Sequence, residues 1–292
     1  MIDPSSGSVV WHCFNCNFST IYTPGQHLNY KFRKLLSWLG MGENEIRWLV
    51  IEAIRIKDLE SAGSAKKEKF EYEPTVYSLP TDAKNVLESL DSSALEFLLE
   101  RNVSPYEYDF YTSQQTEYNL NRRLIIPCTW QKNILGYTAR AWDKSVAKKY
   151  HAQYDKNFVF NMDRQQADWK FALVTEGPFD AMSVHGVSVL GNECNLTQID
   201  LIDSLGREVI VVPDFDVAYK NKQKVWPGAH LIEQALECGW SVSFPVWSET
   251  CKDTNEAVAK YGRLFVIKSI LQAKEHSRLK IEIKKRTWFN NV

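Results

Sequence analysis

Acidic side chains stand directly behind two short apolar runs of this 292-residue chain. Glu176 follows the run at residues 171–175, and Asp214 and Asp216 follow the run at residues 208–212. Each run is continuous, rich in β-forming residues and followed by turn-forming residues, which is typical of a buried parallel strand. We therefore expect the three carboxylates at the carboxyl ends of adjacent strands, where open α/β sheets bind ligands.

Three carboxylates at one edge of a sheet suit a hard cation. Mg²⁺, or Mn²⁺ in its place, binds a few carboxylate oxygens, keeps several waters and shares its charge with substrate phosphates. The pattern therefore favours phosphoryl chemistry, with Glu176, Asp214 and Asp216 as metal ligands and catalytic residues. Glu176 is also a candidate for assisting a proton transfer.

The same residues fall into two short motifs. EGPFDA at residues 176–181 and DFD at residues 214–216 resemble the EGxxDA and DxD signatures of the TOPRIM fold. DnaG-type primases, type IA and type II topoisomerases, and some nucleases and recombination proteins share that fold. The resemblance implies that Gly177 and Asp180 support the metal site. The plainer interpretation is that Asp180 charges a helix start and that the DFD aspartates are turn residues.

A basic segment precedes the acidic motifs. Residues 117–150 hold seven Lys or Arg against two acidic residues, and strands are predicted at residues 123–127 and 135–140. Such a strand surface suits a phosphate backbone or a triphosphate. A solvated sheet face has the same composition, so charge alone leaves both interpretations open.

The order of phrases in this region resembles the amino-terminal lobe of the primase polymerase core. ALEFLLERNVSP, NRRLIIP, LGYTARAW and KKYHAQ occur in the order in which that family has similar phrases. The resemblance implies four template- and nucleotide-facing residues: Arg123, Arg140, Lys149 and Tyr150. Two departures, His151 for the family's asparagine and Ala139 for its glycine, affect the individual contacts.

Further candidates follow the DFD motif. Lys220 and Lys222 either neutralise incoming phosphates or belong to a solvated loop. In the family a glycine often follows the acidic motif closely, whereas here it is deferred to Gly228, which predicts a loop insertion. The phrase KDTNE predicts a helix capped by Asp253 or Thr254. Its resemblance to a third acidic motif of the family implies that Asp253 is also an outer metal or phosphate-site residue.

Near the amino end, Cys13 and Cys16 form a single CxxC pair. A structural zinc site needs four ligands, and only His12 and His27 could complete one locally. HCFNCNF resembles the second half of the zinc ribbon of bacterial and phage primases, without the earlier cysteine pair. The resemblance implies an incomplete Zn²⁺ site, whose missing half is lost or supplied by another polypeptide. Otherwise the two are ordinary cysteines in a turn.

The pattern of helices, strands and linkers predicts an α/β protein, in which an α+β amino-terminal lobe precedes a TOPRIM α/β domain with a mostly parallel central sheet. Residues 30–60 have helical periodicity interrupted at Gly40 and Gly42, and residues 61–75 are small, charged and non-periodic. The expected parts are a zinc-ribbon remnant (1–29), a helical segment (30–60), a linker (61–75), the basic lobe (76–170), the TOPRIM domain (171–262) and a basic helical tail (263–292).

Composition constrains the environment more than the activity. The net charge is −1, so charge favours nucleic acid only in segments such as the tail, which holds eight basic residues against two acidic. We expect the tail to dock as one helix and continue as a basic segment that contacts DNA or a helicase. No apolar run reaches the roughly 18 residues of a membrane span, and no signal peptide is evident. These features predict a cytoplasmic protein with no membrane partner.

The resemblance is closest to the primases of T-even-like bacteriophages and implies template-directed synthesis of short RNA primers. The implied partners are single-stranded DNA, ribonucleoside triphosphates and a replicative helicase. The carboxylates would hold two Mg²⁺, which activate the 3′-hydroxyl and stabilise the leaving pyrophosphate. Two alternatives stay open: another TOPRIM enzyme, such as a nuclease or a topoisomerase fragment, and a truncated, non-catalytic DNA-binding primase. A topoisomerase would also need a nucleophilic tyrosine in a separate domain, which no motif marks.

Overall fold

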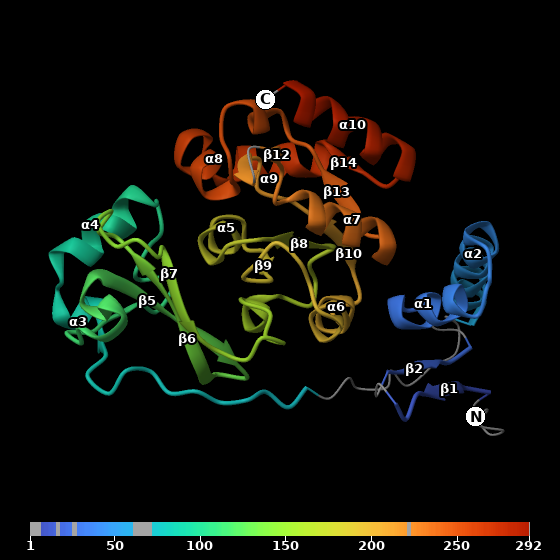
Figure 1. The fold of residues 1–292 in the computed structure, drawn as a ribbon, viewed down its shortest axis with the longest axis horizontal. Coiled ribbons are helices and arrows are strands. Elements are labelled where there is room, and N and C mark those ends of the chain that lie inside the picture. Colours follow the sequence, from blue (N-terminus) through green and yellow to red (C-terminus); the bar gives the residue numbers. More distant parts are fainter. Residues whose placement is uncertain (1–6, 16–17, 25–27, 61–71, 221–222, 292) are drawn as a thin grey trace. The chain divides into compact units, whose positions relative to one another are not determined.

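The computed structural model describes residues 7–15, 18–24, 28–60, 72–220 and 223–291. The chain divides into two compact units, residues 1–71 and 72–292 (Figure 1). The division falls inside the segment that the sequence predicts to be a linker. Among the described helices, none combines the length and the apolar character that a bilayer crossing requires.

The first unit contains a hairpin and two helices. Its elements are β1 (Val9–His12), β2 (Ser19–Tyr22), α1 (Tyr30–Trp38) and α2 (Glu43–Glu60), with β1 and β2 antiparallel. Asn29 caps α1, because its side chain accepts a hydrogen bond from the Phe32 amide at 2.8 Å. The helices separate at Gly40, whose φ of +90° favours glycine. The predicted break of the helical segment is therefore confirmed.

The predicted zinc pair lies only partly in the described chain. Cys13 follows β1, and its amide donates to the Phe18 carbonyl at 2.8 Å. Cys16 and His27 lie outside the described residues. The partial zinc site therefore stays a prediction.

A five-stranded antiparallel sheet begins the second unit. Its order is β3 (Lys84–Asn85), β4 (Tyr111–Thr112), β5 (Arg123–Trp130), β6 (Asn133–Ala141) and β7 (Tyr150–Gln153). The helices α3 (Val86–Ser89), α4 (Ser92–Glu100) and η1 (Glu117–Arg122) lie between these strands in the sequence. β5 and β6 confirm the two strands expected here; β5 begins as predicted and ends three residues later, and β6 extends beyond both predicted ends. Gln131 and Lys132 form the turn between them, with φ of 49° and 66°.

The second sheet of this unit is mostly parallel. Its order is β14 (Lys274–Glu275), β13 (Ser241–Ser243), β10 (Glu208–Val211), β8 (Phe171–Thr175) and β9 (Val187–Ser188). β8 and β10 are parallel neighbours with Val174 opposite Val211, and both side chains are fully buried. This pairing confirms the α/β fold class and the adjacency of the two acid-bearing strands.

Six α-helices, a hairpin and two short 3-10 helices complete the described part of this unit. They are η2 (Met162–Arg164), α5 (Pro178–Val184), α6 (Leu196–Asp203), β11 (Ala218–Lys220), β12 (Gln223–Val225), α7 (Ala229–Cys238), η3 (Val246–Glu249), α8 (Thr254–Tyr261), α9 (Arg263–Gln272) and α10 (Arg278–Asn291). The loop insertion predicted before Gly228 contains the β11–β12 hairpin. Figure 1 shows α10 beside β12 and β14.

The carboxyl-terminal segment differs from its prediction. One docked helix with a basic continuation was expected, but two helices flank the short strand β14. The helical pattern breaks because Lys274 and Glu275 pair antiparallel with β13 and complete the edge of the sheet. The basic residues of α10 are also partly neutralised: Lys284 lies 2.8 Å from Glu275, and Lys285 lies 2.9 Å from Glu233.

One hydrophobic core joins the antiparallel sheet to helix α5, which follows β8 of the parallel sheet. Leu98 of α4, Ile126 of β5 and Phe158 pack in the same cluster as Phe179 and Met182 of α5. Each of these side chains is at most 2% exposed. Because α5 also carries Asp180, the shared core holds an acidic residue in a definite position relative to the antiparallel sheet.

Gly136 should be essential to the antiparallel sheet. Its φ is +140°, and a Cβ would collide with the Gln153 carbonyl oxygen on β7. We expect Gly136→Ala to lower the free energy of unfolding by about 3 kcal/mol, because backbone would have to move. Urea denaturation of both proteins measures the difference.

Gly191→Ala is the matched control, because a Cβ there meets nothing within 4 Å and the backbone is not left-handed. It should change stability by less than about 0.5 kcal/mol. Equal stability losses for the two variants would contradict this account of Gly136.

Candidate active site

Glu176 and Asp214, which follow the two acid-bearing strands, are in direct contact through the Asp214 backbone amide. The amide of Asp214 donates to Glu176 Oε1 at 2.9 Å. A Cβ on Gly228, directly before α7, would lie 2.8 Å from the Asp214 carbonyl oxygen and 2.9 Å from Glu176 Oε1. The start of α7 therefore approaches the pair so closely that only glycine fits. This packing explains why a glycine stands at position 228, although it comes later after the DFD motif than in the primase family.

Asp180 is buried behind this pair on the first turn of α5. Its side chain is held from α8: Oδ1 accepts a hydrogen bond from Thr254 Oγ1 at 3.1 Å and one from the Asn255 amide at 3.0 Å. A Cβ on Gly177 would lie 2.5 Å from Asp180 Oδ2. Asp180 is only 7% exposed. Gly177 and Asp180 thus fit each other sterically, as a pair that supports the site.

Asp253 and Asp216 complete the acidic group, which consists of Glu176, Asp180, Asp214, Asp216 and Asp253. Asp253 caps α8 by accepting a hydrogen bond from the Glu256 amide at 2.7 Å, and it lies 3.5 Å from Lys252 Nζ. It is 7% exposed, whereas Asp216 is exposed to solvent. The capping role expected for Asp253 is therefore present. Its additional role toward a metal or phosphate stays a prediction.

Burial and mutual repulsion disfavour ionisation of the inner carboxyls. Burial, helped by Asp216 and Asp180, raises the pKa of Glu176 to about 7. Burial and the neighbouring Asp253 raise the pKa of Asp180 to about 7. Burial, followed by Asp180 and Glu176, raises the pKa of Asp214 to about 10. A cation bound beside these carboxyls would favour their ionised form and so lower their pKa values.

The donor set fits a hard divalent cation, although the side chains do not enclose one. Within the described residues, no three His, Cys, Asp or Glu side chains converge closely enough to hold a metal ion. Mg²⁺ is often bound through one or two carboxylates with water and substrate phosphate completing its shell. Glu176 and Asp214, joined by the Asp214 amide, suit that mode.

The antiparallel sheet brings basic and aromatic side chains to the same region. The guanidinium of Arg140 on β6 lies 4.7 Å from the ring centroid of Tyr150 on β7. Burial raises the pKa of Tyr150, an effect that Arg140 opposes and that Asp180 and Asp214 reinforce. Tyr150 thus lies within electrostatic range of both the basic side chain of Arg140 and the acidic side chains of Asp180 and Asp214. The Arg140 Nε is buried and, within the described chain, has no hydrogen-bond partner.

Arg123 is engaged with the backbone, and its expected role as a template or nucleotide contact stays a prediction. It is 2% exposed, and its guanidinium donates to four backbone carbonyl oxygens. The distances are 3.0 Å to Tyr118, 3.4 Å to Ala139, 2.7 Å to Lys148 and 3.0 Å to Lys149. Arg123 therefore supports the chain before β7. Lys149 itself is exposed.

Arg101 is a basic residue that the sequence interpretation did not single out. It ends α4, and its guanidinium lies 5.3 Å from the ring centroid of Phe179, the residue before Asp180. Its Nη1 donates to Asn255 Oδ1 at 3.3 Å, and its charge opposes the rise in the pKa of Asp180. In the sequence, Arg101 appears only within the phrase ALEFLLERNVSP, which does not reveal its neighbours.

The remaining lysine candidates are not placed. Lys222 lies outside the described residues, and only the backbone of Lys220, at the end of β11, is described. Their predicted contacts with phosphate stay predictions.

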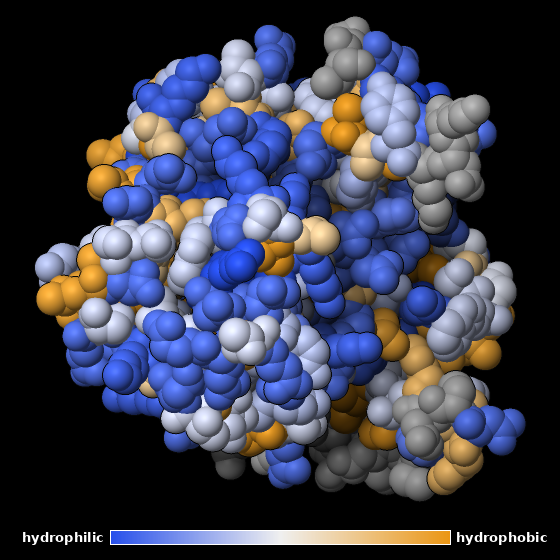
Figure 2. Space-filling model, turned by 60° about the vertical axis from the view of Figure 1, so that its left-hand side comes forward, coloured by the Kyte–Doolittle hydropathy of each residue, from blue (hydrophilic) through white to orange (hydrophobic). Residues whose placement is uncertain are grey.

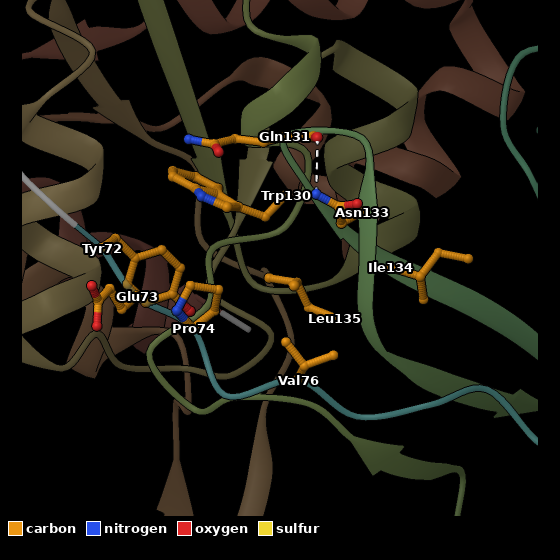
Figure 3. A pocket seen from close by; sticks show the side chains of 9 residues that line it. All are labelled: Tyr72, Glu73, Pro74, Val76, Trp130, Gln131, Asn133, Ile134 and Leu135. Atoms are coloured by element: carbon orange, nitrogen blue, oxygen red, sulfur yellow. Dashed lines mark hydrogen bonds between the residues drawn. The ribbon is translucent and has the colours of Figure 1, made fainter.

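A surface pocket of about 550 Å³ lies away from the acidic group. It is bordered by the segment that enters the second unit and by the β5–β6 turn (Figure 3). Tyr72 and Trp130 meet edge to face there, with ring centroids 5.1 Å apart. The Asn133 side chain donates to the Gln131 carbonyl at 3.3 Å. No residue of the acidic group lines this pocket, so it is not the candidate active site.

The face of the molecule drawn in Figure 2 is mainly hydrophilic, and its apolar side chains gather in small separate patches. Such scattered apolar residues are normal for a protein surface. This face therefore offers polar contacts rather than one extended apolar surface.

Comparison with solved structures identifies the fold. The zinc-binding and RNA polymerase domains of Aquifex aeolicus primase match 98% of this chain and 79% of theirs, with a TM-score of 0.51 and 16% identity. The RNA polymerase domain of Mycobacterium tuberculosis primase DnaG matches 63% of this chain and 77% of its own, with a TM-score of 0.50 and 18% identity. A second structure of that domain, in complex with double-stranded DNA, has the same TM-score and identity. At these identities the likeness shows the fold.

No protein-family model and no curated protein sequence matches the chain. The second unit has the fold of a primase RNA polymerase domain, at 16–18% sequence identity to the structures compared.

Asp180 should make stability depend on pH in the metal-free protein. Its folded pKa is raised to about 7, so its contribution is fully present below the unfolded pKa near 4 and is lost as pH rises toward 7. Asp180→Asn keeps an oxygen acceptor without the charge. We expect it to exceed wild type in unfolding free energy by on the order of 2 kcal/mol at pH 7.5, and by much less at pH 4.

Urea denaturation at the two pH values, with EDTA present, checks this expectation. Asp180→Ala is the control, because it removes both the charge and the acceptor for Thr254 and Asn255. It should be less stable than Asp180→Asn at every pH. A pH-independent difference between Asp180→Asn and wild type would refute the electrostatic account.

Arg123 and its neighbour Arg122 should differ sharply in their effects on stability. Arg123→Lys leaves several buried carbonyls without a donor and should lower the free energy of unfolding by about 3 kcal/mol. Arg122→Lys alters only exposed contacts, with Asp143 and with Ser145 Oγ at 3.3 Å each, and should cost less than about 1 kcal/mol. Chemical denaturation of both variants measures this. Similar losses would show that the Arg123 carbonyl contacts are unimportant.

Proposed function

We propose that this protein is a DNA primase, which synthesises short RNA primers on single-stranded DNA from ribonucleoside triphosphates. The observation that carries the proposal is the apposition of two groups of side chains within a primase polymerase fold. Carboxylates follow the ends of β8 and β10, and Tyr150, whose ring contacts the Arg140 guanidinium, lies within electrostatic range of Asp180 and Asp214. Nucleotidyl transfer needs these two parts, since it depends on positioning and on charge stabilisation.

The acidic side would hold the divalent metal. Glu176 accepts a hydrogen bond from the Asp214 amide, and Asp216 is exposed, so a substrate phosphate could share the ion there. When bound, Mg²⁺ or Mn²⁺ would supply activation of the primer 3′-hydroxyl and charge neutralisation at the leaving pyrophosphate. Asp253 and Asp180 support this group from the starts of α8 and α5.

The basic side would hold the nucleotide or template. Arg140 has a buried Nε that no described residue satisfies, so a phosphate or base oxygen would satisfy it. Tyr150 holds the Arg140 guanidinium by a cation–π contact and orients it. Arg101 adds positive charge within range of Tyr150, and the exposed Lys149 directly precedes Tyr150 in the chain. We assign Arg123 a supporting role beneath them.

Asp214→Asn should abolish primer synthesis while leaving the fold intact. The amide side chain keeps the size but removes the charge that a metal requires, so we expect at least about a 100-fold loss of rate. The assay follows labelled ribonucleotides incorporated on single-stranded DNA with Mg²⁺ or Mn²⁺. Asp109→Asn is the matched control, because this exposed aspartate lies outside the acidic group; its rate should equal that of wild type.

The same assay separates the alternatives. DNA cleavage that requires Asp214, without primer synthesis, would assign the site to a nuclease. DNA binding with neither activity, even with zinc and a replicative helicase added, would indicate a non-catalytic binding module. Primer synthesis by Asp214→Asn at the wild-type rate would refute the assignment of the metal site.

A further inference from the structure

Phe215 separates the two aspartates of the DFD motif and is buried where they are not. It is 4% exposed, while Asp214 is half-buried and Asp216 is exposed. Its amide donates to the Lys252 carbonyl oxygen at 2.5 Å. The position of both carboxylates therefore depends on how firmly the Phe215 side chain is held.

Four aromatic rings surround Phe215. The nearest is Trp288 of α10 with ring centroids 5.4 Å apart, followed by Trp247 at 5.7 Å, Trp226 at 5.8 Å and Phe244 at 6.3 Å. Trp288 also contacts Trp226, with centroids 4.2 Å apart. Trp226 in turn donates from Nε1 to the Asp214 carbonyl oxygen at 2.7 Å. Trp288 therefore reaches the DFD motif both directly and through Trp226.

The helix that carries Trp288 is attached at several points. Ile281 is fully buried, and Lys285 pairs with Glu233 of α7 at 2.9 Å. Near its end, the Phe289 carbonyl accepts a hydrogen bond from Lys224 Nζ of β12 at 2.7 Å. These contacts orient α10 so that Trp288 lies against the aromatic cluster. The carboxyl-terminal helix is thus part of the structure around the acidic group.

We propose that Trp288 is a positioning residue for the acidic group. By closing the aromatic cluster over Phe215, it keeps the Asp214 amide bonded to Glu176 and holds the two aspartates at the sheet edge. Removing the ring would leave Phe215 and Trp226 freer to move, and the DFD segment would open more often. The consequence for metal affinity rests on the proposed function; the consequence for the DFD segment does not.

Amide hydrogen exchange of a peptide covering residues 209–217 tests the structural part directly. Trp288→Ala should speed exchange in this peptide by about tenfold, because two aromatic contacts are lost. Trp288→Phe should restore most of the protection. Trp288→Leu, which keeps apolar bulk without an indole, provides the same test should the alanine variant fail to fold.

Ile281→Ala is the matched control for general loss of packing. Ile281 is buried on the same helix, seven residues and about 10 Å along the axis from Trp288. It should lower the melting temperature without selectively exposing residues 209–217. Unchanged exchange in Trp288→Ala, or equal acceleration in Ile281→Ala, would overturn the proposal.

Calorimetric titration with Mg²⁺ alone tests the functional part. Trp288→Ala should bind Mg²⁺ about tenfold more weakly than wild type, because the closed DFD segment becomes less stable by the same factor as in the exchange experiment. Ile281→Ala should bind Mg²⁺ with an affinity close to that of wild type. Unaltered Mg²⁺ affinity combined with faster exchange would overturn the link between Trp288 and the metal. Absence of Mg²⁺ binding and of primer synthesis in wild type would refute the proposed function, while the exchange result would still decide the role of Trp288.

Discussion

The repulsion between carboxylates that are buried close together is the constraint on which the rest of this structure depends. Burial alone disfavours their charge, and each carboxylate raises the pKa of the others. The chain opposes this with backbone and hydroxyl donors: the Asp214 amide for Glu176, and Thr254 with the Asn255 amide for Asp180. These donors partly offset the cost of placing carboxylates close together in a half-buried site.

Helix starts and glycines make this close approach possible. Asp180 lies in the first turn of α5, Asp253 caps α8, and Gly228 precedes α7 next to Glu176. A side chain at Gly177 or Gly228 would occupy space that the carboxylates already use. The acidic group is therefore shaped by backbone packing as much as by its own side chains.

Side chains from the carboxyl-terminal part of the chain connect the segment that follows α4 with helix α5. The Asn255 side chain donates to the Arg101 carbonyl at 2.7 Å and to Ser183 Oγ at 2.8 Å. Arg263, at the start of α9, donates to the Ser183 carbonyl at 2.9 Å and pairs with Glu107 at 3.3 Å. Together with the shared hydrophobic core, these contacts set the distance between the basic and acidic sides of the site.

The sequence by itself determined the acid-bearing strands, because a continuous apolar run followed by acids is a local pattern. It also indicated the fold class, the break at Gly40 and the cap at Asp253. It could not show that Arg123 is buried, since an arginine on a strand reads as basic surface unless the carbonyls that surround it are known. The partners of Trp288 and Arg101 are likewise far away in the chain. Only the tertiary structure decided these roles, because they arise from contacts between segments whose spacing in the sequence carries no signal.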